Sequence, residues 1–181
     1  SGQEDGTWCR VAVLDARFER GFFFRPEIGD EVVLGFVNDD PRQAVILGML
    51  HSSAKPAPLT GSDDNHEKVY QSRSGMKLSF NDETKILRLE TPAGNAITLS
   101  EDEKSITIQD QNNNKLAMSA DGITLESSKA IILKAATDLT IESASSFAVK
   151  SSADLKLEGS AGVELSSSGV AKIKGSLVQI N

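Results

Sequence analysis

The sequence predicts an all-β chain, with a small barrel near the N-terminus and then an intertwined trimeric parallel β-helix shaped as a triangular prism needle. Three observations on its 181 residues lead to this fold class. Apolar residues in the last third fall in pairs two apart, and the pairs recur every eight residues from 123 to 173. All aromatic residues except Phe147 lie before residue 81. Short alternating segments separated by turn residues fill residues 7–50.

The eight-residue repeat is the strongest signal in the chain. A spacing of two directs both side chains of a pair to one face of a strand, whereas it would separate them on a helix. Serine, alanine and glycine between the pairs suit tight corners. A strict period indicates a repeat architecture. The large apolar residues of the pairs are the predicted trimer core: Ile123, Leu125, Ile131, Leu133, Leu139, Ile141, Phe147, Val149, Leu155, Leu157, Val163, Leu165 and Ile173.

The number of repeats predicts a homotrimer. Three octads make one triangular coil of 24 residues, so the stretch from 123 to 173 completes little more than two coils. A solenoid needs roughly three repeats to bury its core. Three chains wound together would solve this, because each face of the prism would then stack strands from all three chains.

Charges next to the pairs support the same arrangement. If neighbouring strands come from different chains one octad apart, opposite charges would lie side by side, each pair contributing roughly 0.2–1 kcal/mol. A merely solvated face is the alternative reading. The positions that follow the pairs are Glu126, Lys134, Glu142, Lys150, Glu158, Ser166 and Lys174.

Earlier apolar pairs are spaced more loosely, at nine, ten, nine and ten residues from Leu78/Phe80 to Leu116/Met118. We expect this region, 76–118, to be the wider neck of the β-helix, and 119–181 to be the octad needle and its tip. Residues 56–75 have the composition of a linker. Residues 7–55 would form the barrel collar, with strands at Trp8–Leu14, Glu31–Val37 and Ala44–Leu50. Residues 1–6 read as a tag remnant and leader.

A family resemblance follows from the collar. Residues 24–36 read FRPEIGDEVVLGF, residues 40–42 read DPR and residues 45–48 read VILG. This resembles the signature of the spike OB domain of VgrG proteins, from type VI secretion systems and related contractile-phage spikes. Asn38 and Asp39 stand where a glycine often precedes the Asp-Pro. The resemblance implies an OB-fold collar followed by a trimeric β-helix needle.

The resemblance also implies a function. The chain would be a non-enzymatic trimeric membrane-piercing spike of a contractile injection system, without the large N-terminal hub of full-length relatives. It would meet tube or baseplate proteins at its N-terminal end and carry effectors. It would be assembled in the bacterial cytoplasm without a signal peptide, then secreted or injected into the target cell. A PAAR-repeat tip protein would bind at Leu177, Val178, Gln179, Ile180 and Asn181.

The residues suggest no catalytic site, metal or cofactor. The net charge of −7 argues against nucleic-acid binding. His51, near the end of the collar, and His66, in the linker, have no evident catalytic partner. The segment from Asp110 to Asn114 imitates the start of a calcium loop, but Lys115 occupies the position that needs glycine. We therefore expect an asparagine-rich turn there.

Two other classes of protein share part of this pattern. A trimeric tail-fibre or adhesin stalk would have the same needle and would bind a receptor or polysaccharide, but it lacks the OB signature. A single-chain β-helix lyase would be a monomer with charged catalytic residues clustered on one face.

Overall fold

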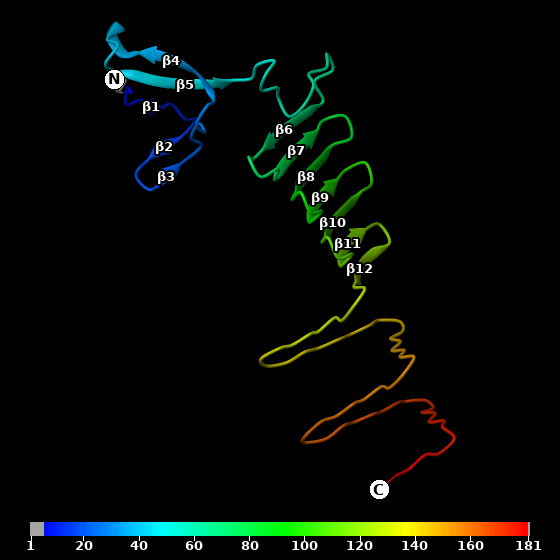
Figure 1. Cartoon of the computed structure of the whole chain (residues 1–181). Helices are drawn as coiled ribbons and strands as arrows, with labels where there is room; N and C mark the ends of the chain where they lie inside the picture. The colour runs from blue at the N-terminus through cyan, green and yellow to red at the C-terminus, as the bar shows by residue number, and fades with distance from the viewer. Residues whose placement is uncertain (1–5, 181) are drawn as a thin grey trace. The chain divides into compact units, whose positions relative to one another are not determined.

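The computed structural model describes residues 6–180, which divide into two units at Ile131/Ile132. Within the described residues, the regular structure consists of twelve strands and one short 3₁₀ segment, η1 (Val37–Asp39) (Figure 1). The chain is therefore all-β, as predicted. The expected tag remnant at Ser1 and Gly2 and the tip residue Asn181 lie outside the described residues.

The collar region contains a small sheet and a hairpin, an arrangement consistent with an OB domain. In the sheet, β5 lies between β1, to which it is parallel, and β4, to which it is antiparallel. The predicted strand Ala44–Leu50 is confirmed, and the expected strand Trp8–Leu14 shortens to two residues. The elements are β1 (Arg10–Val11), β2 (Ala16–Arg17), β3 (Arg20–Gly21), β4 (Glu31–Phe36) and β5 (Ala44–Leu50).

The turn between β4 and β5 is closed by Asp40. Its carboxylate accepts hydrogen bonds from the backbone N–H of Arg42 and from the Arg42 guanidinium, each at 3.0 Å. The guanidinium bond is the main reason that the pKa of Asp40 lies below its ordinary value. The preceding Asn38 and Asp39 adopt left-handed φ values of 53° and 56°, which Asn and Asp tolerate better than most residues. The Asp-Pro-Arg segment therefore sets the β4–β5 connection.

The second sheet is an antiparallel meander, which corrects two assignments made from the sequence. Residues 67–71 lie in β6 and not in a linker. The expected parallel β-helix neck at 76–118 is instead formed of strands that each pair antiparallel with the next. The strands are β6 (Glu67–Gln71), β7 (Lys77–Asn81), β8 (Ile86–Glu90), β9 (Ala96–Ser100), β10 (Ser105–Gln109), β11 (Lys115–Ser119) and β12 (Gly122–Glu126).

The nine- and ten-residue spacings have a simple cause in this sheet. Together they make a 19-residue hairpin unit with two strands and two different turns, so Leu78, Ile97 and Leu116 are equivalent positions. Antiparallel neighbours need only a short turn between them, whereas parallel neighbours need a long crossover or a complete coil. The first octad pair, Ile123 and Leu125, also belongs to this sheet, in β12.

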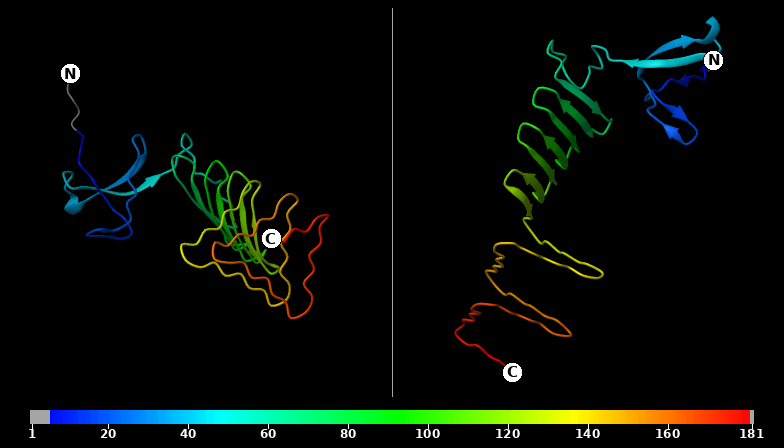
Figure 2. Two further views of the ribbon diagram at one scale, coloured as in Figure 1. Left: turned by 90° about the horizontal axis from the view of Figure 1, so that it is seen from below. Right: turned by 180° about the vertical axis from the view of Figure 1, so that it is seen from behind.

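The second unit contains no strand within its described residues, 132–180. Its chain runs as a wide open coil, which is seen end-on in Figure 2. Bends recur every eight residues; the first five lie between two of the predicted apolar pairs, and the sixth follows the last pair. They fall at 136–137, 144–145, 152–153, 160–161, 168–169 and 176–177.

Candidate functional site

One face of the seven-stranded sheet carries two rows of mostly apolar side chains running from β6 to β12. Residues directly opposite each other on neighbouring strands lie on the same face, and the strand register aligns them without a break. The first row is Tyr70, Leu78, Leu89, Ile97, Ile108, Leu116 and Leu125. The second row is Lys68, Phe80, Leu87, Leu99, Ile106, Met118 and Ile123. We call these rows the apolar face.

The apolar face is open. Leu89 is 51% exposed, Ile97 is 40% exposed and Ile123 is 71% exposed. A hollow of about 900 Å³ lies over the first row, with Ile108 and Leu116 among its lining residues. Contiguous exposed apolar surface of this kind marks an interaction site.

The opposite face of the sheet is polar and internally paired. Arg88 in β8 contacts the Glu90 carboxylate at 2.7 Å and donates to the Thr98 hydroxyl at 3.1 Å. Lys77 approaches the other Glu90 oxygen at 3.3 Å. These contacts lower the pKa of Glu90, with the Arg88 hydrogen bond contributing most and Lys77 next. The apolar face thus has the chemistry of an inner surface, and the polar face has the chemistry of a solvent-facing one.

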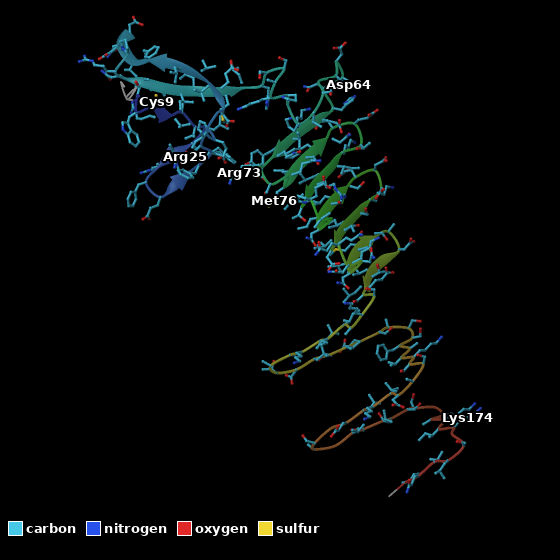
Figure 3. All side chains as sticks on the ribbon, viewed as in Figure 1. Cys9, Arg25, Asp64, Arg73, Met76 and Lys174 are labelled. Atoms are coloured by element: carbon cyan, nitrogen blue, oxygen red, sulfur yellow. The ribbon has the colours of Figure 1, made fainter. Side chains whose placement is uncertain are left out.

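The predicted trimer-core residues beyond β12 lie along the open coil. Leu139 is 60% exposed, Phe147 is 66% exposed and Leu165 is 78% exposed. Figure 3 shows side chains projecting from this segment, among them the labelled Lys174. Because the described residues of this unit contain no strand, none of its segments are joined by strand pairing. In a single chain, the apolar pairs therefore recur at the same point of each eight-residue repeat, but they are not packed against one another.

The predicted tip residues do not form a pocket within one chain. Leu177 lies in the last bend and is 80% exposed, Val178 is 48% exposed and Ile180 is 88% exposed. Gln179 is also exposed. Leu177, Val178 and Ile180 are thus exposed apolar side chains, with the polar Gln179 among them.

In the turn that resembled a calcium loop, amide groups of the turn itself donate hydrogen bonds to the Asp110 carboxylate. The Asp110 carboxylate accepts the backbone N–H of Asn112 at 2.8 Å and that of Asn114 at 2.9 Å. The carboxamides of the same residues donate at 3.3 and 2.7 Å. These bonds, led by the Asn114 side chain, lower the pKa of Asp110 to about 2. Donors aimed at both carboxylate oxygens disfavour a bound cation, which agrees with the expected asparagine-rich turn.

Over residues 6–180, no group of three or more His, Cys, Asp or Glu side chains is placed to hold a metal ion. The Asp64 carboxylate in the predicted linker accepts the Ser62 hydroxyl at 2.6 Å, and this bond is the largest cause of its lowered pKa. The described part of the chain contains no helix with the length and hydropathy needed to span a bilayer.

Two hydrogen bonds beyond β12 were not anticipated from the sequence. The Ser127 hydroxyl donates to the Asn114 side-chain oxygen at 2.6 Å, and the Ser128 hydroxyl donates to the Asn112 carbonyl at 3.2 Å. These bonds connect the residues that follow β12 to the β10–β11 turn. The 19-residue equivalence of Thr91 and Asp110 was the available signal, because the next equivalent position is residue 129, close to Ser127 and Ser128.

Comparison with known proteins defines the class of the collar. Residues 1–51 match the family described as the type VI secretion system/phage-baseplate injector OB domain. This agrees with the strands and the Asp40 turn found between residues 10 and 50.

Two curated proteins specify the relationship further. The chain is 31% identical over 88 residues to the type VI secretion system spike protein VgrG3 of Vibrio cholerae serotype O1, covering 46% of this chain and 9% of that protein. It is 29% identical over 92 residues to the actin cross-linking toxin VgrG1 of Vibrio cholerae serotype O1, covering 51% of this chain and 8% of the toxin. The chain is thus related to the VgrG-type spike proteins of type VI secretion, and its match spans less than a tenth of these relatives.

Proposed function

We propose that the chain is part of a non-enzymatic, membrane-piercing spike that works as a homotrimer in a contractile injection system. The observation that carries this proposal is the continuous apolar face of the sheet, followed by apolar pairs placed between bends eight residues apart. Neither set has a partner surface within the described part of one chain. Exposed apolar area of this extent would be unfavourable unless it is buried on assembly.

In the trimer, the three apolar faces pack against one another around a common axis. In the second unit, the coils of three chains interleave, so that each segment gains parallel neighbours from the other two chains. All apolar pairs then point to the axis, and Glu142 of one chain lies beside Lys150 of another. A closed ladder leaves few free strand edges and resists bending. A stiff, closed prism is suited to being driven through an envelope by a contracting sheath.

The collar would connect this spike to tube or baseplate proteins. The VgrG relationship and the exposed apolar side chains of Leu177, Val178 and Ile180 further support a PAAR-repeat protein bound there, with effectors carried on the assembly. The spike would be assembled in the bacterial cytoplasm and then secreted or injected. A tail-fibre or adhesin stalk that binds a receptor or polysaccharide shares the coil, but the injector OB domain favours the spike.

Light scattering after size-exclusion chromatography tests the proposal. A trimer has three times the chain mass of 19.3 kDa, and an elongated one elutes early for that mass. A monodisperse single chain would overturn the trimer and the needle. A trimer that binds specific glycans on an array but no injection-system component would favour the stalk.

A further inference from the structure

The β10–β11 turn repeats the β8–β9 turn with one important difference. In the earlier turn, the Thr91 hydroxyl accepts the Asn95 N–H at 3.3 Å and its carboxamide at 3.0 Å. Nineteen residues later, Asp110 accepts the same two groups of Asn114, at 2.9 and 2.7 Å. The threonine of the first turn is thus replaced by a carboxylate, whose hydrogen bonds are charge-assisted and stronger.

Each turn is also bonded to the chain that comes after it. The Asn95 side-chain oxygen accepts the Gln111 N–H at 3.2 Å, within the sheet. The equivalent oxygen of Asn114 accepts the Ser127 hydroxyl at 2.6 Å. Ser127 directly follows β12, the last strand of the meander. It therefore stands where antiparallel pairing stops and the first bend, at 128–129, begins.

The octads alone do not define how three chains align. A chain displaced by eight residues still places an apolar pair against an apolar pair at nearly every level. The displaced chain loses its contacts between opposite charges, because its Glu142 would then lie beside Glu142 of the neighbouring chain and not beside Lys150. Each such like-charged contact costs roughly 0.2–1 kcal/mol, and solvent screening reduces this cost, so the charges contribute to the register. A second contribution is available where the sequence is not octadic, which is the antiparallel sheet.

We propose that the hydrogen-bonded cluster of Asp110, Asn112, Asn114, Ser127 and Ser128 is a junction that fixes the register of the three coils. It holds the first residues after β12 against the sheet, so that every chain begins its coil at the same residue and at the same height. This inference rests on the proposed trimer. It adds to that proposal a residue-level device for alignment, located in the sheet.

A slipped chain would be detectable by disulfide formation. In register, residue 140 of the three chains lies on three different faces of the prism, so cysteines there are too far apart to bridge. If one chain slips by an octad, its residue 140 moves about 4.8 Å along the axis and onto the face that holds residue 140 of a neighbour. Two adjacent parallel strands then bring these cysteines within the range that a disulfide spans.

The parent for the experiment is the full chain with Cys9→Ser and Thr140→Cys. Asn114→Ala and Ser127→Ala each remove the Ser127 contact, and Ser127→Ala removes only a hydroxyl at the end of the sheet. Asn95→Ala is the matched control, because it alters the equivalent turn one repeat earlier. A Thr140→Cys/Ala148→Cys parent is the positive control, since these positions of different chains are neighbours in the aligned trimer.

Each protein is oxidised, and its disulfide-linked pairs are quantified by denaturing electrophoresis alongside its solution mass. The expected result is a roughly fivefold rise in linked pairs for Asn114→Ala and Ser127→Ala, the effect of one lost hydrogen bond, and no rise for Asn95→Ala. A trimeric parent whose Ser127→Ala variant shows no rise would overturn the junction alone. A single-chain parent, with no 140–148 linkage, would overturn the trimer and the junction together.

Discussion

Leu89 and Ile97 are paired directly across β8 and β9, and both side chains lie on the open apolar face. The same relationship holds for each pair of neighbouring strands from β7 to β12, because the 19-residue unit returns an apolar residue to each row. The face is thus a property of the whole sheet. Its burial between copies of the chain is the first expectation that can be tested.

Leu99→Asp should prevent assembly. Leu99 lies in the second row, opposite Leu87 and Ile106, and a carboxylate buried there without a partner costs several kcal/mol per chain. Thr98→Asp is the matched control, since Thr98 lies on the other face beside the Arg88 guanidinium. Light scattering should give the mass of a single chain for Leu99→Asp and the parent mass for Thr98→Asp. Parent mass for both variants would mean that this face is not buried.

Leu157→Ala should lower the thermal stability of the assembly. Leu157 is 66% exposed in the single chain, so the substitution should have little effect unless other chains cover it. Removing a buried leucine side chain costs about 2–5 kcal/mol per site, and a trimer has three such sites. Lys156→Ala, at the outward position of the same pair, should shift the melting temperature much less. Equal melting temperatures for the two variants in calorimetry would count against the inward placement of Leu157.

The octad period allowed the bends of the second unit to be anticipated from the sequence, because small residues at fixed spacing permit corners and little else. The OB signature at Pro26–Phe36 likewise indicated the strand at β4. The direction of the strands in the sheet was not anticipated. A spacing of two places Leu78 and Phe80 on one face whether the next strand is parallel or antiparallel. Only the alternation of nine and ten residues distinguishes the two cases.

The tertiary contacts of individual side chains could also not be predicted from the sequence. Asp110 and Asn114 were correctly placed in a turn from their composition. That Asn114 also accepts a hydrogen bond from Ser127 depends on the shorter connection between β11 and β12, through Ala120 and Asp121. A shift of two residues in that connection would change which residue meets Asn114. Spacing along the chain alone could not resolve this.

Stability should fall in acid through Asp110. Its pKa is about 2 in the folded chain, below the ordinary aspartate value. A carboxyl group with a lowered pKa adds stability above its ordinary pKa near 4, and this contribution is lost as the pH falls toward 2. Asp110→Asn should therefore be less stable than the parent at pH 7, with a difference that narrows between about pH 4 and pH 2. Melting temperatures across this range measure it, and a pH-independent difference would contradict the assignment.

Removal of residues 177–181 should abolish binding of a PAAR-repeat protein and leave the trimer intact. Leu177, Val178 and Ile180 are the apolar side chains of this segment, and three copies together would form an apolar triangle at the end of the prism. Six octad pairs remain after the truncation from Ile131 to Ile173, so the solution mass should stay that of three truncated chains. Gln179→Ala is the control, because it changes the segment without removing apolar surface. Pull-down with a PAAR-repeat protein measures the outcome. Binding that persists in the truncated trimer would place the partner elsewhere on the spike.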